Sequence, residues 1–134
     1  MNERLYDRDQ TNRALPLVRA IVADVRRTRT EYDAALARYE ALSGQPLPSQ
    51  EELNRLHRAL IATEQERASC LRELDDLSIV LDHGKDGVCD FPAELDGRSV
   101  MLCWHPDDEQ LEFFHGRDEA YGARRPLPVP VHCE

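Results

Sequence analysis

The sequence has no long apolar run, and this bounds where the protein can reside. Its longest apolar stretch in the C-terminal part is 100–104, far shorter than the roughly 20 residues that a membrane-spanning helix needs. The first residues include Glu3 and Arg4 and lead into no apolar segment, so we expect no signal peptide. We therefore expect a cytoplasmic protein without a membrane partner.

Positive charge is also scarce. The 17 Lys and Arg residues are outnumbered by 26 Asp and Glu residues, which gives a net charge of -9. This balance opposes general attraction to nucleic acid or to an anionic membrane surface. Hydrophobic residues still make up 41% of the chain, too many for a disordered protein.

Several chemical motifs are missing. The sequence has no nucleophile elbow, no phosphate-binding loop and no metalloprotease motif. It has no Cys-x-x-Cys pair either, and its four cysteines are widely spaced, at Cys70, Cys89, Cys103 and Cys133. In a cytosolic chain this spacing predicts reduced, unpaired thiols. Nothing in the motifs assigns a catalytic residue, and whether the protein is an enzyme stays open.

Two long helices are predicted by periodicity. Core-type positions recur at steps of 3 and 4, as in a coiled coil. The first series is Leu15, Val18, Val22, Val25, Arg29, Tyr32, Leu36 and Tyr39, and the second is Leu53, Leu56, Leu60, Thr63, Arg67, Cys70, Leu74, Leu77 and Leu81. Capping-box spacing predicts the helix starts, at Asp7 with Gln10 and at Ser49 with Glu52.

The two series mirror each other about Pro46. A short loop forces antiparallel neighbours, so we expect a helical hairpin with a kink or restart near Pro16 and a second helix that ends near 82–84. Arg29 and Arg67 interrupt the seam, and we expect Glu64 and Glu66 to pair with them. Their role is either to fix the register or to bind a ligand.

The stripe of apolar residues along each helix widens at the end of the hairpin that lies away from the connecting loop. Such a stripe needs more than one partner helix, so the C-terminal module, a second subunit or both should cover it. Beyond residue 84 the period changes, and three short strands are expected at 87–91, 98–104 and 111–114, the first two joined by a connection at 92–97 that contains Asp96-Gly97. The proline-rich tail should be extended. The fold class is thus α+β: a coiled-coil-like antiparallel helical hairpin, 1–84, with a three-stranded antiparallel sheet in a β-rich module, 85–134, packed at its base.

Several short motifs resemble those of a known family. They are Pro16-Leu17-Val18, the run 87–93, Asp96-Gly97-Arg98, Leu102-Cys103-Trp104, Phe113-Phe114-His115 and the run 124–127. In this order they resemble the DUF2203 family of small bacterial and archaeal proteins, for which no function is established. The resemblance covers nearly the whole chain. It implies the same architecture and brings no activity.

A metal site is one interpretation of the β-rich module. Cys103 and His105 lie two residues apart at a strand end, and His115 lies on the next strand. Such N and S ligands could hold zinc, with Cys89 or with His132 and Cys133 to complete the site. The alternative is that the cysteines are ordinary buried residues, with no cofactor.

Two further sets of residues could form a site or a surface. A polar pocket of Asp90, His115, Asp118 and Arg125 could supply a general acid and base, or it could be a structural set of caps and ion pairs. Phe91, Trp104 and Phe114 are expected to form core, and any exposed remainder would be a partner surface.

We expect a non-catalytic interaction or scaffold protein. Its hairpin would mediate homodimerisation or docking of an unknown protein partner, because the stripe is too wide for two helices. The alternative is a zinc-type metal-binding protein or metal-dependent enzyme that uses Cys103, His105 and His115. No nucleic-acid partner is expected.

Overall fold

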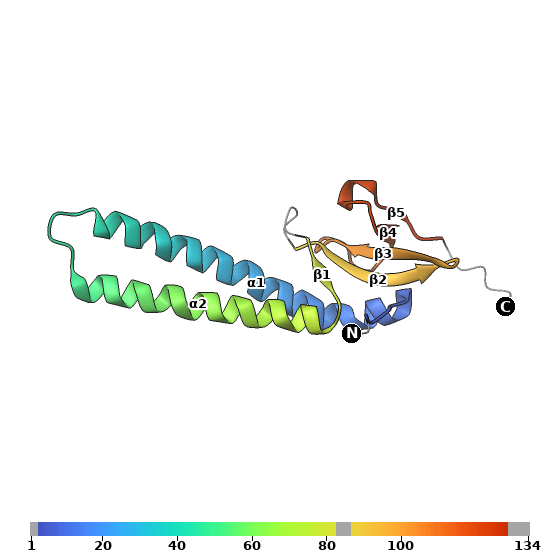
Figure 1. Cartoon of the computed structure of the whole chain (residues 1–134), viewed down its shortest axis with the longest axis horizontal. Coiled ribbons are helices and arrows are strands. Elements are labelled where there is room, and N and C mark those ends of the chain that lie inside the picture. Colours follow the sequence, from blue (N-terminus) through green and yellow to red (C-terminus); the bar gives the residue numbers. More distant parts are fainter. Residues whose placement is uncertain (1–2, 83–86, 129–134) are drawn as a thin grey trace. The chain divides into compact units, whose positions relative to one another are not determined.

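The computed structural model of the chain describes residues 3–82 and 87–128. Two helices are followed by a small sheet, which makes the fold α+β (Figure 1). The elements in chain order are α1 (Arg8–Ser43), α2 (Gln50–Asp76), β1 (Val80–Leu81), β2 (Cys89–Leu95), β3 (Arg98–Trp104), β4 (Phe113–Gly116), the 3-10 helix η1 (Tyr121–Ala123) and β5 (Arg125–Pro126). No helix among the described residues is both long and apolar enough to span a membrane.

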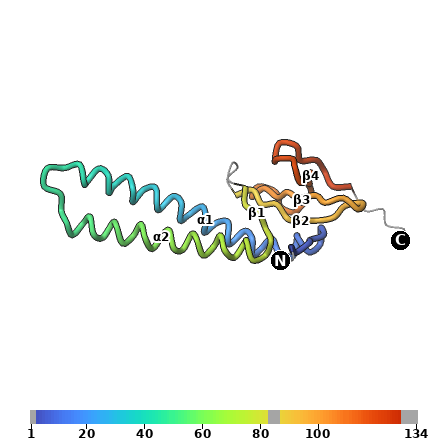
Figure 2. The backbone as a smooth tube through the Cα atoms, in the orientation of Figure 1, coloured from blue at the N-terminus to red at the C-terminus, as the bar shows by residue number. Residues whose placement is uncertain are grey.

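The chain forms two compact units, and Figure 2 traces the backbone through both. The hairpin unit is 20–73, and the sheet unit combines 1–19 with 74–134. The sheet unit therefore contains the first turns of α1 and the end of α2 as well as every strand.

The sheet has five strands in the order β1-β2-β3-β4-β5, all antiparallel. The prediction of three strands is therefore wrong in number. The two strands that it missed, β1 and β5, are each two residues long, too short to show an alternating pattern. Pro126 lies in β5 at the sheet edge, where a missing backbone donor is tolerated.

The connection between β2 and β3 is shorter than predicted: β2 runs to Leu95, so residues 92–95 belong to the strand and Asp96-Gly97 forms the turn. The last predicted strand, 111–114, is displaced as well, because β4 is Phe113–Gly116. Asp96 and Gly97 both have positive φ, 52° and 78°, as a type I′ hairpin turn requires. Leu95 therefore pairs with Arg98, and the register continues without a break to Cys89 and Trp104.

The predicted capping box at the start of α1 is confirmed in both of its bonds, and the one at the start of α2 in its serine bond. At the start of α1, the backbone N–H of Gln10 donates to Asp7 Oδ1 at 2.7 Å, and the backbone N–H of Asp7 donates to Gln10 Oε1 at 2.9 Å. At the start of α2, the backbone N–H of Glu52 donates to Ser49 Oγ at 3.2 Å. Of the predicted kink or restart at 12–16, the restart is wrong, because α1 continues through Pro16 as one helix.

The second helix ends earlier than predicted, at Asp76. Ser78 has a φ of 62°, and Ile79 N–H donates back to Leu74 O at 2.9 Å while Ser78 N–H donates to Asp75 O at 2.9 Å. These two bonds form a Schellman motif, whose left-handed residue stops the helix. Leu74 and Ile79 occupy the two positions at which this motif usually carries an apolar pair, and both are buried.

The hairpin unit is an antiparallel pair of helices, as predicted. Arg27 of α1 pairs with Glu66 of α2, and nearer the loop Arg38 pairs with Glu52 at 3.4 Å. The predicted pairing of Glu66 with a seam arginine is thus wrong in its partner. At the point of α1 where Arg29 was expected in the seam, the buried residue is Thr28, and Arg29 is exposed.

Thr28 can be buried because its hydroxyl is satisfied within its own helix. It donates to the carbonyl of Asp24, at 2.8 Å, and lies 3.0 Å from that of Val25. A guanidinium at the same place would need a charged partner to be buried.

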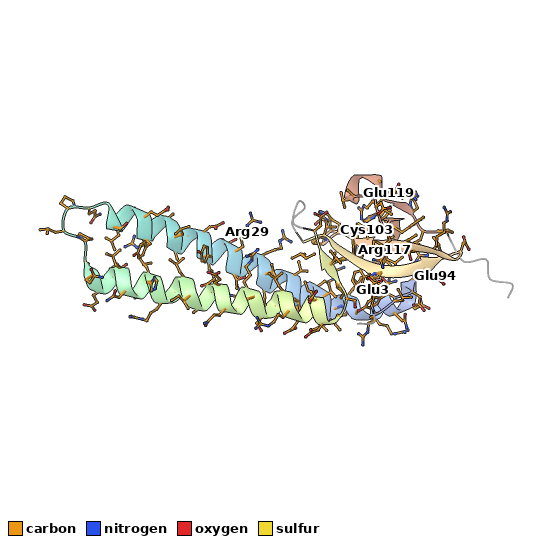
Figure 3. All side chains as sticks on the ribbon, viewed as in Figure 1. Glu3, Arg29, Glu94, Cys103, Arg117 and Glu119 are labelled. Atoms are coloured by element: carbon orange, nitrogen blue, oxygen red, sulfur yellow. The ribbon has the colours of Figure 1, made fainter. Side chains whose placement is uncertain are left out.

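The central strands of the sheet unit are buried on both faces. One face carries Phe91 and Trp104 and packs on the start of the chain, where Tyr6 meets Phe91 edge-to-face at 5.2 Å between ring centroids. On the other face, Arg117 lies 3.4 Å from Met101 Sδ and pairs with Glu3 (Figure 3). The candidate site lies on this second face.

Candidate metal centre

Three adjacent strands bring three ligand-type side chains to one face of the sheet. Asp90 of β2 is the direct partner of Cys103 of β3, and His115 of β4 is the partner of Met101, two residues before Cys103. Cross-strand partners point to the same side of a sheet, and so do residues two apart along a strand. The register therefore gathers Asp90, Cys103 and His115, which we call the Asp-Cys-His cluster.

The geometry of the cluster is tight. One ligand atom from each residue, a carboxylate oxygen, Sγ and an imidazole nitrogen, lies within 4.8 Å of the other two. Asp90 Oδ1 is 3.1 Å from His115 Nε2, and the Cys103 thiol donates a hydrogen bond to the Asp90 carboxylate. The His115 side chain is 2% exposed and that of Asp90 is 15% exposed, so Asp90 forms the open side.

The orientation of His115 is set by the backbone. Its Nδ1 lies 2.7 Å from the carbonyl oxygen of Gly116. A carbonyl only accepts, so Nδ1 carries the hydrogen. Nε2 is then the atom that faces Asp90, and it is available as a donor, an acceptor or a metal ligand.

Burial controls the electrostatics of the cluster. It raises the pKa of the Asp90 carboxyl, and the charge of His115 and the hydrogen bonds from Cys103 and His115 oppose that shift. Burial and then the negative charge of Asp90 raise the pKa of the Cys103 thiol well above its ordinary value. Without a metal, Cys103 is therefore a protonated thiol at neutral pH.

A fixed cation borders the cluster. Arg124 donates a hydrogen bond to Cys103, and its Nη1 lies 2.8 Å from Asp108 Oδ2. Its guanidinium carbon is also 4.2 Å from the ring centroid of Phe113 and 4.5 Å from that of Tyr121. These contacts hold Arg124 in place, and its charge favours the ionised form of the neighbouring sulfur.

The predicted metal ligands are only partly brought together. Cys103 and His115 belong to the cluster, but His105 does not. The backbone turns directly after β3, where Asp108 N–H donates to His105 O, and the Asp107 N–H donates to His105 Nδ1 at 3.0 Å. Asp90 provides the third ligand in place of His105, while His132 and Cys133 lie outside the described residues.

Cys89 is also apart from the cluster. It alternates with Asp90 along β2 and so points to the opposite face, where its Sγ lies 3.7 Å from the carbonyl oxygen of Gly87. Burial raises the pKa of its thiol to about 12. Both thiols are free, and they are separated by the sheet.

The predicted polar pocket is split in the same way. Asp90 and His115 form a buried pair, but Asp118 and Arg125 are exposed. Arg125 instead pairs with Glu119 at 2.8 Å and lies over the Phe114 ring at 4.8 Å from its centroid. Only the Asp90–His115 half of that set is a shared site.

The predicted partner surface is largely internal. Phe91 and Trp104 are buried on the face opposite the cluster, and Trp104 Nε1 donates to the Asp108 carbonyl at 2.9 Å. Phe114 is half-buried. Phe91 and Trp104 therefore serve as core, and Phe114 is the one member of the set that retains appreciable exposure.

The sequence contains a signal for the missing ligand. A two-residue turn at Asp96-Gly97 pairs the residues that lie equally far before and after it, so that Asp90 falls opposite Cys103. Counting outward from this turn along both strands is enough to identify the pair.

One comparison with known proteins found a match. The model of the family described as "Uncharacterized conserved protein (DUF2203)" matches residues 4–127. No curated protein and no solved structure matches the sequence.

Proposed function

Since the chain belongs to the DUF2203 family of uncharacterized conserved proteins, whose description names no activity, we propose a function from the geometry of the sheet unit. The protein binds a divalent transition metal, zinc by preference, through Asp90, Cys103 and His115. The observation that carries this proposal is the approach of one O, one S and one N ligand atom within 4.8 Å of one another.

The donor set favours zinc over harder cations. Mg²⁺ and Ca²⁺ take oxygen ligands almost exclusively, whereas thiolate sulfur and imidazole nitrogen are standard ligands of Zn²⁺. Cys103 and His115 supply these two, and Asp90 adds a carboxylate. Three protein ligands leave one tetrahedral position, and the partly exposed Asp90 is the side from which water or a small ligand could fill it.

The environment of His115 supports the same role. A metal-bound histidine usually donates its second ring N–H to a carbonyl or a carboxylate, which fixes the ring and its tautomer. The contact of Nδ1 with the Gly116 carbonyl at 2.7 Å is of this kind, and it leaves Nε2 directed at the cluster.

Metal binding would release the protons that the cluster holds in the metal-free protein. The metal-free cluster holds the Cys103 thiol proton and one proton between Asp90 Oδ1 and His115 Nε2, because a hydrogen bond between those atoms requires one. A divalent cation replaces both, so affinity should rise with pH. The charge of Arg124 beside Cys103 partly opposes the cation and favours the thiolate.

The test uses two cysteines on opposite faces of the sheet. Elemental analysis and zinc titration of the purified chain should give about one equivalent, with a rise in Tm on zinc addition. Cys103→Ala should abolish the binding. Cys89→Ala, on the opposite face, is the matched control and should retain it. Less than a few tenths of an equivalent in the wild type, or equal binding by both variants, would reject the proposal.

A second candidate function rests on the hairpin unit. The seam side chains Leu36, Leu56 and Leu60 are only half-buried, and Ile61 is 45% exposed. Two helices seldom bury enough apolar surface to be stable alone. We therefore propose that a second copy packs on this face as a four-helix bundle, a scaffold role independent of the metal site.

Sedimentation at micromolar concentration tests this second function. The wild type should sediment as a dimer, and Leu56→Glu should shift it to the monomer while zinc binding persists. A wild-type monomer at that concentration would remove the homodimer from consideration.

A further inference from the structure

A groove on the hairpin unit is lined by two arginine side chains that pair with no carboxylate of the described residues. It has a volume of about 420 Å³ and lies wholly within 20–73, and we call it the hairpin groove. Its lining consists of Arg29, Tyr32 and Asp33 from α1 and Thr63, Glu64 and Arg67 from α2. Figure 3 labels Arg29 on α1. The volume is in the range of sites that bind small molecules.

One nitrogen of the Arg67 side chain is buried without a hydrogen-bond acceptor among the residues that the structure describes. Its Nε atom is buried and has no partner within the described part of the chain. Buried donors are nearly always satisfied, and those on charged groups are the most costly to leave unpaired. Among residues 3–82 and 87–128, no ion pair involves Arg67 or Arg29.

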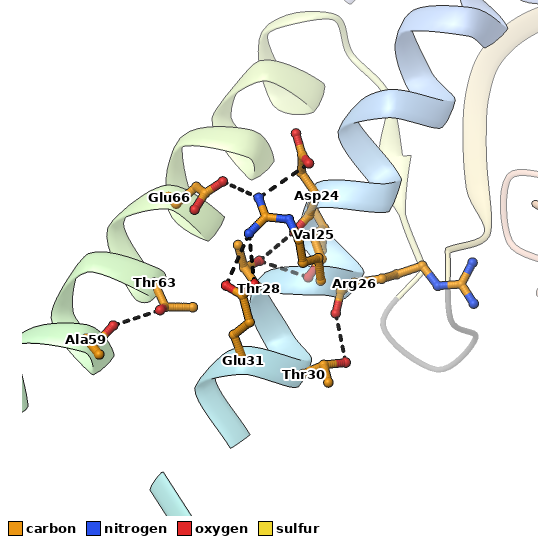
Figure 4. Close-up of polar contacts among 10 residues, drawn as sticks. Asp24, Val25, Arg26, Thr28, Thr30, Glu31, Ala59, Thr63 and Glu66 are labelled. Carbon is orange, nitrogen blue, oxygen red and sulfur yellow. Dashed lines mark hydrogen bonds and ion pairs between the residues drawn. The ribbon is translucent and has the colours of Figure 1, made fainter. Parts of the chain in front are cut away.

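A neighbouring arginine shows that the hairpin can give a guanidinium several carboxylate partners. Arg27 meets the carboxylates of Glu66, Glu31 and Asp24, the three acids labelled in Figure 4. Hydrogen bonds to Glu66 and then Glu31 raise the pKa of Arg27 above its ordinary value. The same pair of helices therefore surrounds one arginine with acids, whereas Arg29 and Arg67 face an open groove.

The acids of the hairpin groove restrict what it can bind. Asp33 and Glu64 line it and are exposed, so they disfavour a polyanion such as nucleic acid and favour a ligand that also carries a cationic group. The Thr63 hydroxyl donates to the Ala59 carbonyl at 2.7 Å, which leaves its oxygen free to accept.

We propose that the hairpin groove binds a small zwitterionic molecule, with an oxyanion held by Arg29 and Arg67 and an amine held by Asp33 and Glu64. Planar guanidinium groups match the oxygens of a phosphate or a carboxylate. An oxyanion in the groove would meet the guanidinium groups of Arg29 and Arg67, which have no carboxylate partner among the described residues. This inference does not depend on the metal centre.

The experiment is a titration of the full chain at low ionic strength, followed by calorimetry or amide NMR, with three probes. O-phosphoethanolamine should bind saturably, inorganic phosphate at least tenfold more weakly, and ethanolamine without saturation. Arg67→Gln should weaken binding of O-phosphoethanolamine at least tenfold. Arg58→Gln changes an exposed residue of the same helix outside the groove and should leave binding unchanged.

A stability measurement separates ligand binding from a structural role for Arg67. Arg67→Met keeps the length of the side chain and removes the unsatisfied donor, so its Tm should equal or exceed that of the wild type while binding is lost. A markedly lower Tm would identify Arg67 as a structural residue and overturn the proposal. So would absence of saturable binding to the wild type, binding of phosphate as tight as that of O-phosphoethanolamine, or full affinity in Arg67→Gln.

Discussion

Asp90 lies directly across the β2–β3 pair from Cys103, and its carboxylate accepts the hydrogen bond of the Cys103 thiol. The pairing places an acid and a thiol, both costly to ionise in a buried setting, side by side on one face of the sheet. The negative charge of Asp90 raises the pKa of the Cys103 thiol, whereas the hydrogen bond from the thiol favours the ionised form of Asp90. The stability of the metal-free protein should therefore depend on pH in a specific way.

Alkaline pH should destabilise the metal-free protein. Burial raises the pKa of Cys89 from 9.0 to about 12 and that of Cys103 above its ordinary value. Between the unfolded and folded pKa values the folded chain holds more thiol protons than the unfolded chain, so the free energy of unfolding falls as pH rises. The slope should approach ~1.4 kcal/mol per pH unit for each thiol.

Urea denaturation between pH 8 and 11 measures this slope. Changing both residues, Cys89→Ala with Cys103→Ala, should flatten it, and each single change should remove about half. A wild-type free energy of unfolding that stays level across this range would contradict the assignment of buried, protonated thiols.

The end of α2 offers a test of backbone strain. Ser78 has a φ of 62°, a conformation that costs a side-chain-bearing residue about 1–2 kcal/mol relative to glycine. Ser78→Gly and Ser78→Ala both lose the bond that the Arg4 N–H donates to Ser78 Oγ. Ser78→Gly should thus be the more stable of the two by about 1 kcal/mol in thermal or urea unfolding. Equal stabilities would mean that the helix end is not held in the left-handed region.

Two glycines form a matched pair for the hairpin turn. A Cβ added at Gly97 or at Gly122 would meet nothing within 4 Å, but only Gly97 of these two has a positive φ, 78°. Gly97→Ala should cost about 1–2 kcal/mol through backbone strain alone, whereas Gly122→Ala should be neutral or stabilising by up to about 1 kcal/mol. Urea unfolding of the two variants measures this difference, and a Gly122→Ala loss as large as that of Gly97→Ala would argue against it.

Arg19 anchors the loop between β3 and β4. Its guanidinium donates to the carbonyls of Pro106, Asp108 and Glu109 at 3.2, 2.6 and 2.9 Å and lies over Trp104 at 5.0 Å. Because lysine lacks the planar fork, Arg19→Lys should lower the free energy of unfolding by about 1–3 kcal/mol.

Amide hydrogen exchange in the loop 105–110 gives a local reading of the same change. Arg13→Lys, an exposed position on the same helix, serves as the control. Unchanged protection of the loop in Arg19→Lys would show that Trp104 and Asp108 hold it without Arg19.

The sequence predicted the elements whose signals are local. Both capping boxes and the Asp96-Gly97 turn follow from residues within a few positions of one another. The end of α2 could not be predicted, because a left-handed residue at a helix end is usually glycine and here it is Ser78. The apolar spacing also continues through Leu77 and Leu81. The shortest strands, β1 and β5, exist through pairing with longer neighbours and leave no pattern of their own.

The candidate site was predicted in part for a related reason. Cys103 and His115 were expected together, and the structure places them so. His105 would share a face with Cys103 only if β3 continued, but the chain turns after Trp104 and strand alternation stops there. Asp90 joins Cys103 only through the residue-by-residue pairing of β2 with β3, which the spacing of ligand-type residues along the chain does not show.

The tight turn at Asp96-Gly97 has a consequence for the length of the chain around it. Side chains alternate faces along a strand, so inserting or deleting one residue between 91 and 102 moves every later side chain of β3 to the other side. The sulfur of Cys103 would then join the packed interior, and Trp104 would face Asp90 and His115. Natural variants of this segment should therefore gain or lose residues in pairs, or carry a bulge that restores the alternation.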